Sequence, residues 1–266
     1  MSSDFQEVRG VDGSSVRDRD GRTIVEGGNP SKLLAQSYGF MAIGLIVSAS
    51  VAFLIGWAFA TWIGKATILD DFESAKTAII TYFAIMIGSF VALLIDGFVL
   101  RFAFMRGKHS ILPHYLIYAT LMGVFLSSFV VLGVDFRLIG LAAGISAVVF
   151  LALFFVGFFS KRDFSFLAYF GLALLFGASI MSMVFIPLFI FAPGAYLQFS
   201  LMFSGIYFIV LLIATAIDGY QIRKMLSQCA EQKNVALYCG FVMYSDFIVI
   251  FIRVLYYLLL ITAKRK

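Results

Sequence analysis

The sequence predicts an all-α membrane protein: a bundle of seven transmembrane helices in which the last helix is central. Of its 266 residues, 62% are hydrophobic and 13% are charged, whereas a soluble domain is nearer half apolar and a quarter charged. The apolar residues also form runs longer than the ~20 that a helix needs to cross a bilayer. These runs lack the period-two alternation of membrane β-strands, so helices are the expected spanning elements.

Residues 1–31 are polar and contain few residues that could build a core. We expect a disordered cytoplasmic tail there, followed by one transmembrane domain over residues 32–266. The last predicted span has an aspartate near its middle, which suggests that the other helices surround it. The predicted spans are Leu33–Ile63, Ala78–Met105, Leu112–Val134, Leu138–Phe159, Phe164–Phe191, Tyr196–Ile217 (continuing to Met225 if the helix is longer) and Asn234–Ala263.

Lysines and arginines in short loops indicate which ends of the helices face the cytoplasm. The tail and the loops after the second, fourth and sixth spans are basic, whereas the opposite loops hold Lys65, Lys76 and Arg137 beside several acids. The N-terminus is therefore expected in the cytoplasm. Residues 264–266 are basic and would end outside, so a re-entrant last segment is the alternative to seven spans. The net charge of +5 fits these loops, and we expect no nucleic-acid partner.

Two aspartates lie in the last two apolar spans. A carboxylate at such depth costs on the order of 2.5–3.5 kcal/mol, unless it faces a wet cavity or a partner. Asp218 would lie roughly 10 Å, and Asp246 roughly 16 Å, from the same end of two antiparallel neighbouring helices. The two carboxylates could therefore meet. The alternatives are that Asp218 marks a helix end at the interface, and that Asp246 pairs with a buried donor that only holds the fold.

Four other polar residues are weaker candidates. Arg253 follows Asp246 by seven residues and shares its helical face, so it is either a counter-charge or a side chain that reaches the far interface. Asp96 faces the bundle interior or the headgroups. His109 and His114 are expected to be ordinary loop residues.

The two cysteines do not indicate a cofactor. Cys229 and Cys239 have no metal-ligand spacing and suggest no disulfide framework. We expect no cofactor, apart from calcium as a bound or transported ion. The spacing of Gly140 and Gly144 in the fourth span is typical of helix–helix contacts in membranes.

Three stretches resemble the transmembrane Bax-inhibitor-motif family. They are YSDFIVIFIRVLYYL at 244–258, AIDGYQIRKM at 216–225 and SKRDFSFLAYFGLAL at 160–174. In addition, FAFMRG at 102–107 resembles the basic end of that family's second helix. The hydropathy pattern agrees over nearly everything after the tail.

The resemblance implies a central seventh helix wrapped by six others, in a bacterial inner (plasma) membrane. It implies that Asp218 and Asp246 form a hydrogen-bonded pair in a pH-sensitive calcium leak channel. Arg106 would occupy a latch position, with Asp96 and Arg253 as further latch or counter-charge candidates. Carboxylates are ligands that calcium prefers, so the pair would be the ion site. Two close carboxylates in a low-dielectric site share a proton, so the pair would also be the pH sensor.

Two other functions remain open. The first is regulatory: some bacterial members of the family that the chain resembles bind a membrane-bound AAA protease and modulate it. For this function the tail and the cytoplasmic loops would be the important regions. Two helix-borne aspartates also suit an intramembrane aspartyl protease, but the Gly-x-Gly-Asp motif of that class is missing around Asp218 and Asp246. We therefore expect a protein that is not an enzyme and whose partners are the bilayer, calcium ions and protons, with a membrane-bound protease as the partner in the alternative function.

Overall fold

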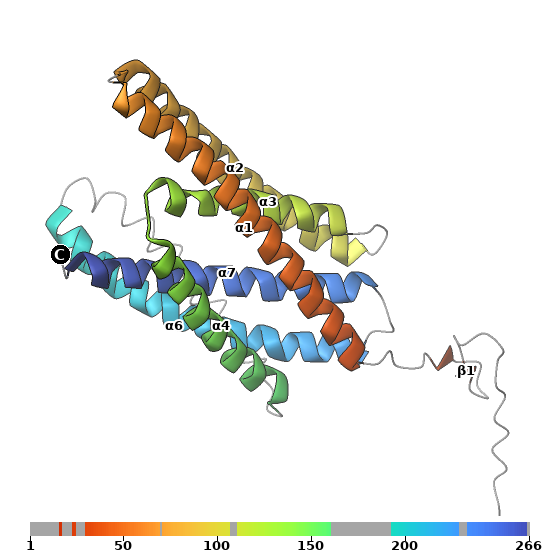
Figure 1. Cartoon of the computed structure of the whole chain (residues 1–266). Helices are drawn as coiled ribbons and strands as arrows, with labels where there is room; N and C mark the ends of the chain where they lie inside the picture. Colours follow the sequence, from red (N-terminus) through yellow and green to blue (C-terminus); the bar gives the residue numbers. More distant parts are fainter. Residues whose placement is uncertain are drawn as a thin grey trace, which may run out of the picture.

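A computed structural model describes residues 16–17, 23–24, 30–69, 71–106, 111–160, 193–228 and 233–264. Figure 1 shows its helices as a bundle, with labels that follow the chain. The elements are β1 Val16–Arg17, β2 Thr23–Ile24, α1 Pro30–Ile68, α2 Phe72–Arg106, α3 Leu112–Val131, α4 Phe136–Phe159, α6 Pro193–Gln228 and α7 Lys233–Lys264.

The described helices confirm an all-α membrane-spanning architecture. Six of them are long and apolar enough to cross a bilayer, and each overlaps a span that the sequence predicts. The predicted fifth span, Phe164–Phe191, lies outside the described residues, so the count of seven stays a prediction. Within the predicted tail, β1 and β2 pair antiparallel over two residues each. A ladder of that size builds no core, and the expected disorder of residues 1–31 also stays a prediction.

Helix α7 lies inside the bundle. It packs against α1, α3, α4 and α6, and Figure 1 shows it running through the middle of the molecule beside α6. Its fully buried side chains include Leu237, Met243, Tyr244, Ile250 and Leu255. These residues fall on more than one face of the helix, which is typical of a helix enclosed by others.

Two glycines bring α4 and α6 into backbone contact. A Cβ on Gly157 would collide with the carbonyl oxygen of Ala216, and a Cβ on Gly219 would lie 2.7 Å from the carbonyl oxygen of Phe154. Only glycine permits so close an approach between two helices. The GxxxG spacing in α4 suggested a different contact, yet a Cβ on Gly140 or Gly144 would meet no described atom within 4 Å.

A third close approach joins α1 to α3. The hydroxyl of the fully buried Tyr115 donates a hydrogen bond of 2.7 Å to the carbonyl oxygen of Phe40. The ring occupies the space beside Gly44, where a Cβ would also lie 2.9 Å from the ring of Tyr244 on α7. This contact fixes α1 and α3 against the central helix.

Helices α1 and α2 form a long hairpin whose tip extends beyond the other helices (Figure 1). They have 39 and 35 residues, so at 1.5 Å per residue each is roughly 50–60 Å long, against a hydrocarbon layer of roughly 30 Å. Near the tip, Trp62 Nε1 donates to Ser74 Oγ at 3.4 Å. Trp57 and Trp62 are both exposed, at 59% and 40%.

Candidate ion site between α6 and α7

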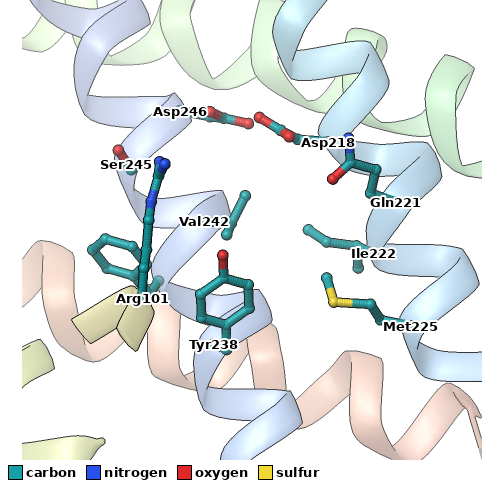
Figure 2. Close-up of a pocket in the computed structure, with 10 residues that line it drawn as sticks. Arg101, Asp218, Gln221, Ile222, Met225, Tyr238, Val242, Ser245 and Asp246 are labelled. Atoms are coloured by element: carbon teal, nitrogen blue, oxygen red, sulfur yellow. The ribbon is translucent and has the colours of Figure 1, made fainter. Parts of the chain in front are cut away.

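The two intramembrane aspartates meet between α6 and α7. Asp218 and Asp246 point toward each other across a cavity of about 190 Å³ (Figure 2). The two carboxyl groups are close enough to interact electrostatically. An ionised carboxylate can only accept hydrogen bonds, so a direct hydrogen bond between two such groups would need a proton on one of them. The roles of ion site and pH sensor stay predictions.

Packing of α4 against α6 sets the position of Asp218. The next residue, Gly219, lies against the backbone of Phe154, so the depth and rotation of α6 are fixed directly beside the carboxylate. Asp246 follows the buried residues Met243 and Tyr244 on α7. Both aspartates are therefore carried by rigid, enclosed stretches of helix.

A basic side chain that was not predicted as a site residue also lines the cavity. Arg101 of α2 extends along the cavity toward Ser245 and the carboxyl pair (Figure 2), where its charge acts on Asp218. Arg106, which the resemblance placed at the latch position, is the exposed last residue of α2 and does not line this cavity. Five residues correspond to roughly 140° around a helix, so the two arginines cannot both face it.

The remaining lining is polar near the aspartates and apolar elsewhere. Gln221, Tyr238 and Ser245 add an amide and two hydroxyl groups, and the apolar part consists of Ile222, Met225, Phe241 and Val242. The Ser245 side chain lies near the hydroxyl of Tyr118 on α3. Carboxyl, hydroxyl and amide oxygens are the ligands of hard cations. Within the described residues, no group of three or more His, Cys, Asp or Glu side chains could hold a metal ion.

Asp96 lies away from the cavity and pairs with a histidine. It is 9% exposed, and its Oδ1 is 3.0 Å from His114 Nδ1. The expectation that His114 is an ordinary loop residue is wrong, because His114 lies in the first turn of α3. Pro113 beside it is a common residue at the start of a helix and could have indicated this. His109 lies outside the described residues.

Arg253 contacts α6 rather than the carboxyl pair. Its Nη1 donates to Ser204 Oγ at 3.2 Å, and its guanidinium lies 4.6 Å from the centre of the Tyr207 ring. The Tyr257 hydroxyl donates to the same Ser204 oxygen at 3.1 Å. Arg253 is absent from the residues that line the cavity. Its contacts therefore favour a role in holding α6 against α7 over a role as counter-charge for Asp246.

Comparisons with known proteins agree with the fold. A family model described as "Inhibitor of apoptosis-promoting Bax1" matches residues 30–263, which span every described helix almost completely. A search of curated proteins finds no match. Because the family model covers far more than half of the chain, and because the described helices have the length and hydropathy of membrane spans, this integral membrane protein belongs to the Bax inhibitor family.

Proposed function

We propose that the protein is a pH-sensitive, calcium-permeable leak channel, with Asp218 and Asp246 as its ion site and proton sensor. The observation that carries this proposal is the meeting of two carboxyl groups in a cavity between two membrane-spanning helices. A carboxylate inside a span is costly and usually marks an ion or proton pathway. The bacterial inner membrane and a cytoplasmic N-terminus are the expected location and orientation.

The cavity suits transient calcium binding better than tight binding. Calcium takes six to eight oxygen ligands in proteins, and the two carboxyl groups, with Gln221, Tyr238 and Ser245, supply part of such a shell. Water would complete it. The guanidinium of Arg101 repels a cation in the same cavity, which weakens binding further. An ion that binds weakly can also leave, as conduction requires.

Protons and calcium should compete for this site. A hydrogen bond between Asp218 and Asp246 would need a shared proton, whereas calcium needs ionised carboxylates. At low pH the shared proton links α6 to α7. As the pH rises the proton is lost, the two charges repel each other, and a calcium ion between them becomes favourable. Calcium affinity and flux are therefore expected to increase with pH.

The test is calcium flux into dye-loaded liposomes that contain the purified full-length protein. Asp218→Asn and Asp246→Asn keep the size of each side chain but remove a charged ligand, which costs about 1.5–3 kcal/mol, or roughly tenfold or more in calcium affinity. Glu73→Gln is the matched control, because Glu73 is an exposed carboxylate in the first turn of α2. Unchanged affinity and flux in both Asn variants would exclude the pair as the ion site.

The same pair of carboxyl groups would also suit an aspartyl protease, the less favoured alternative. We expect no catalysis, because the glycine motif of that class is missing from the sequence. Incubation of the wild-type protein with intramembrane peptide substrates would decide this point: cleavage that disappears in Asp246→Asn would replace the channel proposal with an enzyme.

A further inference from the structure

A second polar pair lies outside the cavity, where α2 packs against α3. Asp96 is nine-tenths buried, and its Oδ1 lies 3.0 Å from His114 Nδ1. The other carboxyl oxygen, Oδ2, is buried and has no hydrogen-bond partner among the described residues. The described surroundings therefore give this carboxyl group one polar partner, and that partner is titratable.

Proton exchange at this pair would occur on the histidine. An ionised Asp96 can only accept a hydrogen bond, so Nδ1 of His114 must carry a hydrogen. Nε2 is then the atom that gains or loses a proton, and the 38% exposure of the His114 side chain gives protons a route to the ring. Imidazoles change charge between about pH 5 and 8. With the proton, the pair is a buried ion pair; without it, Asp96 is a buried carboxylate that has lost its counter-charge.

The pair is linked to the cavity through Tyr118 and Arg101. Tyr118 follows His114 by one helical turn, and its hydroxyl lies near the side chain of Ser245 in the cavity wall. Its ring packs beside Gly97, the neighbour of Asp96. Arg101 follows Asp96 by five residues on α2, and Tyr118 lies within electrostatic range of both charges. A change of charge at the pair would therefore alter the electrostatic potential at Tyr118, which interacts with both Asp96 and Arg101.

The other titratable groups near the pair are few. Tyr118 on α3 interacts electrostatically with Asp96 and with Arg101 of α2, Tyr115 directly follows His114 on α3, and Tyr244 of α7 faces Tyr118 with its ring centroid 6.3 Å away. Helix α1, which packs against both α2 and α3, carries only Tyr38 and, near its ends, Lys32 and Lys65 as titratable side chains. None of the tyrosines or lysines normally changes charge between pH 5 and 8.

We propose that Asp96 and His114 form a second proton-binding site, which regulates the cavity between α6 and α7 from a distance. Proton uptake at His114 cancels the negative charge of Asp96 beside Arg101, so the cavity becomes less favourable for a cation. Proton release restores that negative charge and favours the cation. The regulatory part of this inference rests on the proposed ion site, whereas the proton site itself does not.

The proton site can be tested without any transport assay. The chain has two histidines, so His109→Gln leaves His114 as the sole imidazole, and its ring signals can be followed by NMR in the full-length protein in bilayers. The ring signals are followed as the pH is varied, and Asp96→Asn is expected to move the midpoint of their change to lower pH, because a close opposite charge stabilises the protonated ring. A ring that does not titrate, or a midpoint that Asp96→Asn leaves in place, would overturn the proposal.

The regulatory part is tested by calcium flux at pH 6 and pH 8, with His114→Gln compared with its parent. We expect the ratio of the two fluxes to fall about fivefold or more, the lower end of typical coupling between sites. The matched control is Tyr82→Phe, which removes another side-chain hydrogen bond between α2 and α3, from Tyr82 to Ser127 at 3.0 Å, but no group that titrates in this range. An equal fall of the flux ratio in Tyr82→Phe would show that the Asp96–His114 pair acts only by holding α2 against α3. That result would overturn regulation by protons. Normal titration of His114 in a protein that conducts no calcium would instead refute the proposed channel and leave the proton site standing.

Discussion

Replacing Gly219 by alanine tests whether the contact between α4 and α6 holds the aspartate pair in place. The new Cβ would lie 2.7 Å from the carbonyl oxygen of Phe154, where ordinary contact begins at 3.4 Å. Because the obstacle is backbone, α6 must shift by about 0.7 Å, the difference between these two distances. Overpacking of this kind costs about 1–3 kcal/mol. The shift would also carry Asp218, the preceding residue, away from Asp246.

The control is Gly205→Ala on the same helix, where a Cβ would meet no described atom within 4 Å. Both variants gain the same helix propensity of about 1 kcal/mol, so their difference isolates the overpacking. At roughly 2–4 °C per kcal/mol for a chain of this size class, Gly219→Ala should unfold about 2–12 °C below Gly205→Ala in detergent. It should also bind calcium more weakly. Equal melting temperatures would refute the backbone contact, and unchanged calcium affinity would refute its role in placing Asp218.

Three further predictions follow from the site and the sequence. Arg101→Gln should raise calcium affinity by removing a cation from the cavity, whereas Arg106→Gln should leave it unchanged; a titration of both variants against wild type checks this. In a background without native cysteines, a single cysteine at residue 162 should react with an impermeant reagent only from the cytoplasm. A single cysteine at residue 65 should react only from outside, and the reverse pattern would overturn the predicted topology. Removal of residues 1–31 should leave calcium flux intact, and a protease-related phenotype that disappears in the same variant would favour the protein-binding alternative.

Much of the fold could be predicted because hydropathy alone decides which segments cross a membrane. The predicted spans are several residues shorter than α1 and α2, because each helix continues beyond its apolar run through polar residues such as Lys65 and Glu73. Asp218 and Asp246 were placed near each other by comparing their depths on two neighbouring helices. That estimate needs only the rise per residue and a short connecting loop.

The sequence was less informative where the rotation of a helix decides the outcome. Arg101 and Arg106 both lie near the end of α2, and only the packing of that helix shows which of them faces the cavity. The glycines present the same difficulty: Gly140 and Gly144 have the familiar spacing, but Gly157 and Gly219 make the contact, because the choice depends on which face meets the partner. The pairing of Asp96 with His114 required knowledge of how α2 and α3 align.

The long hairpin of α1 and α2 makes the protein's own fluorescence a selective reporter. The chain has two tryptophans, and both, Trp57 and Trp62, lie in the second half of α1, exposed and far along the sequence from either aspartate. Their emission therefore reports the surroundings of the hairpin, not those of the cavity. A spectral change on acidification would mean that the hairpin has moved relative to the lipid. A constant spectrum alongside changing flux would confine the response to pH to the interior of the bundle.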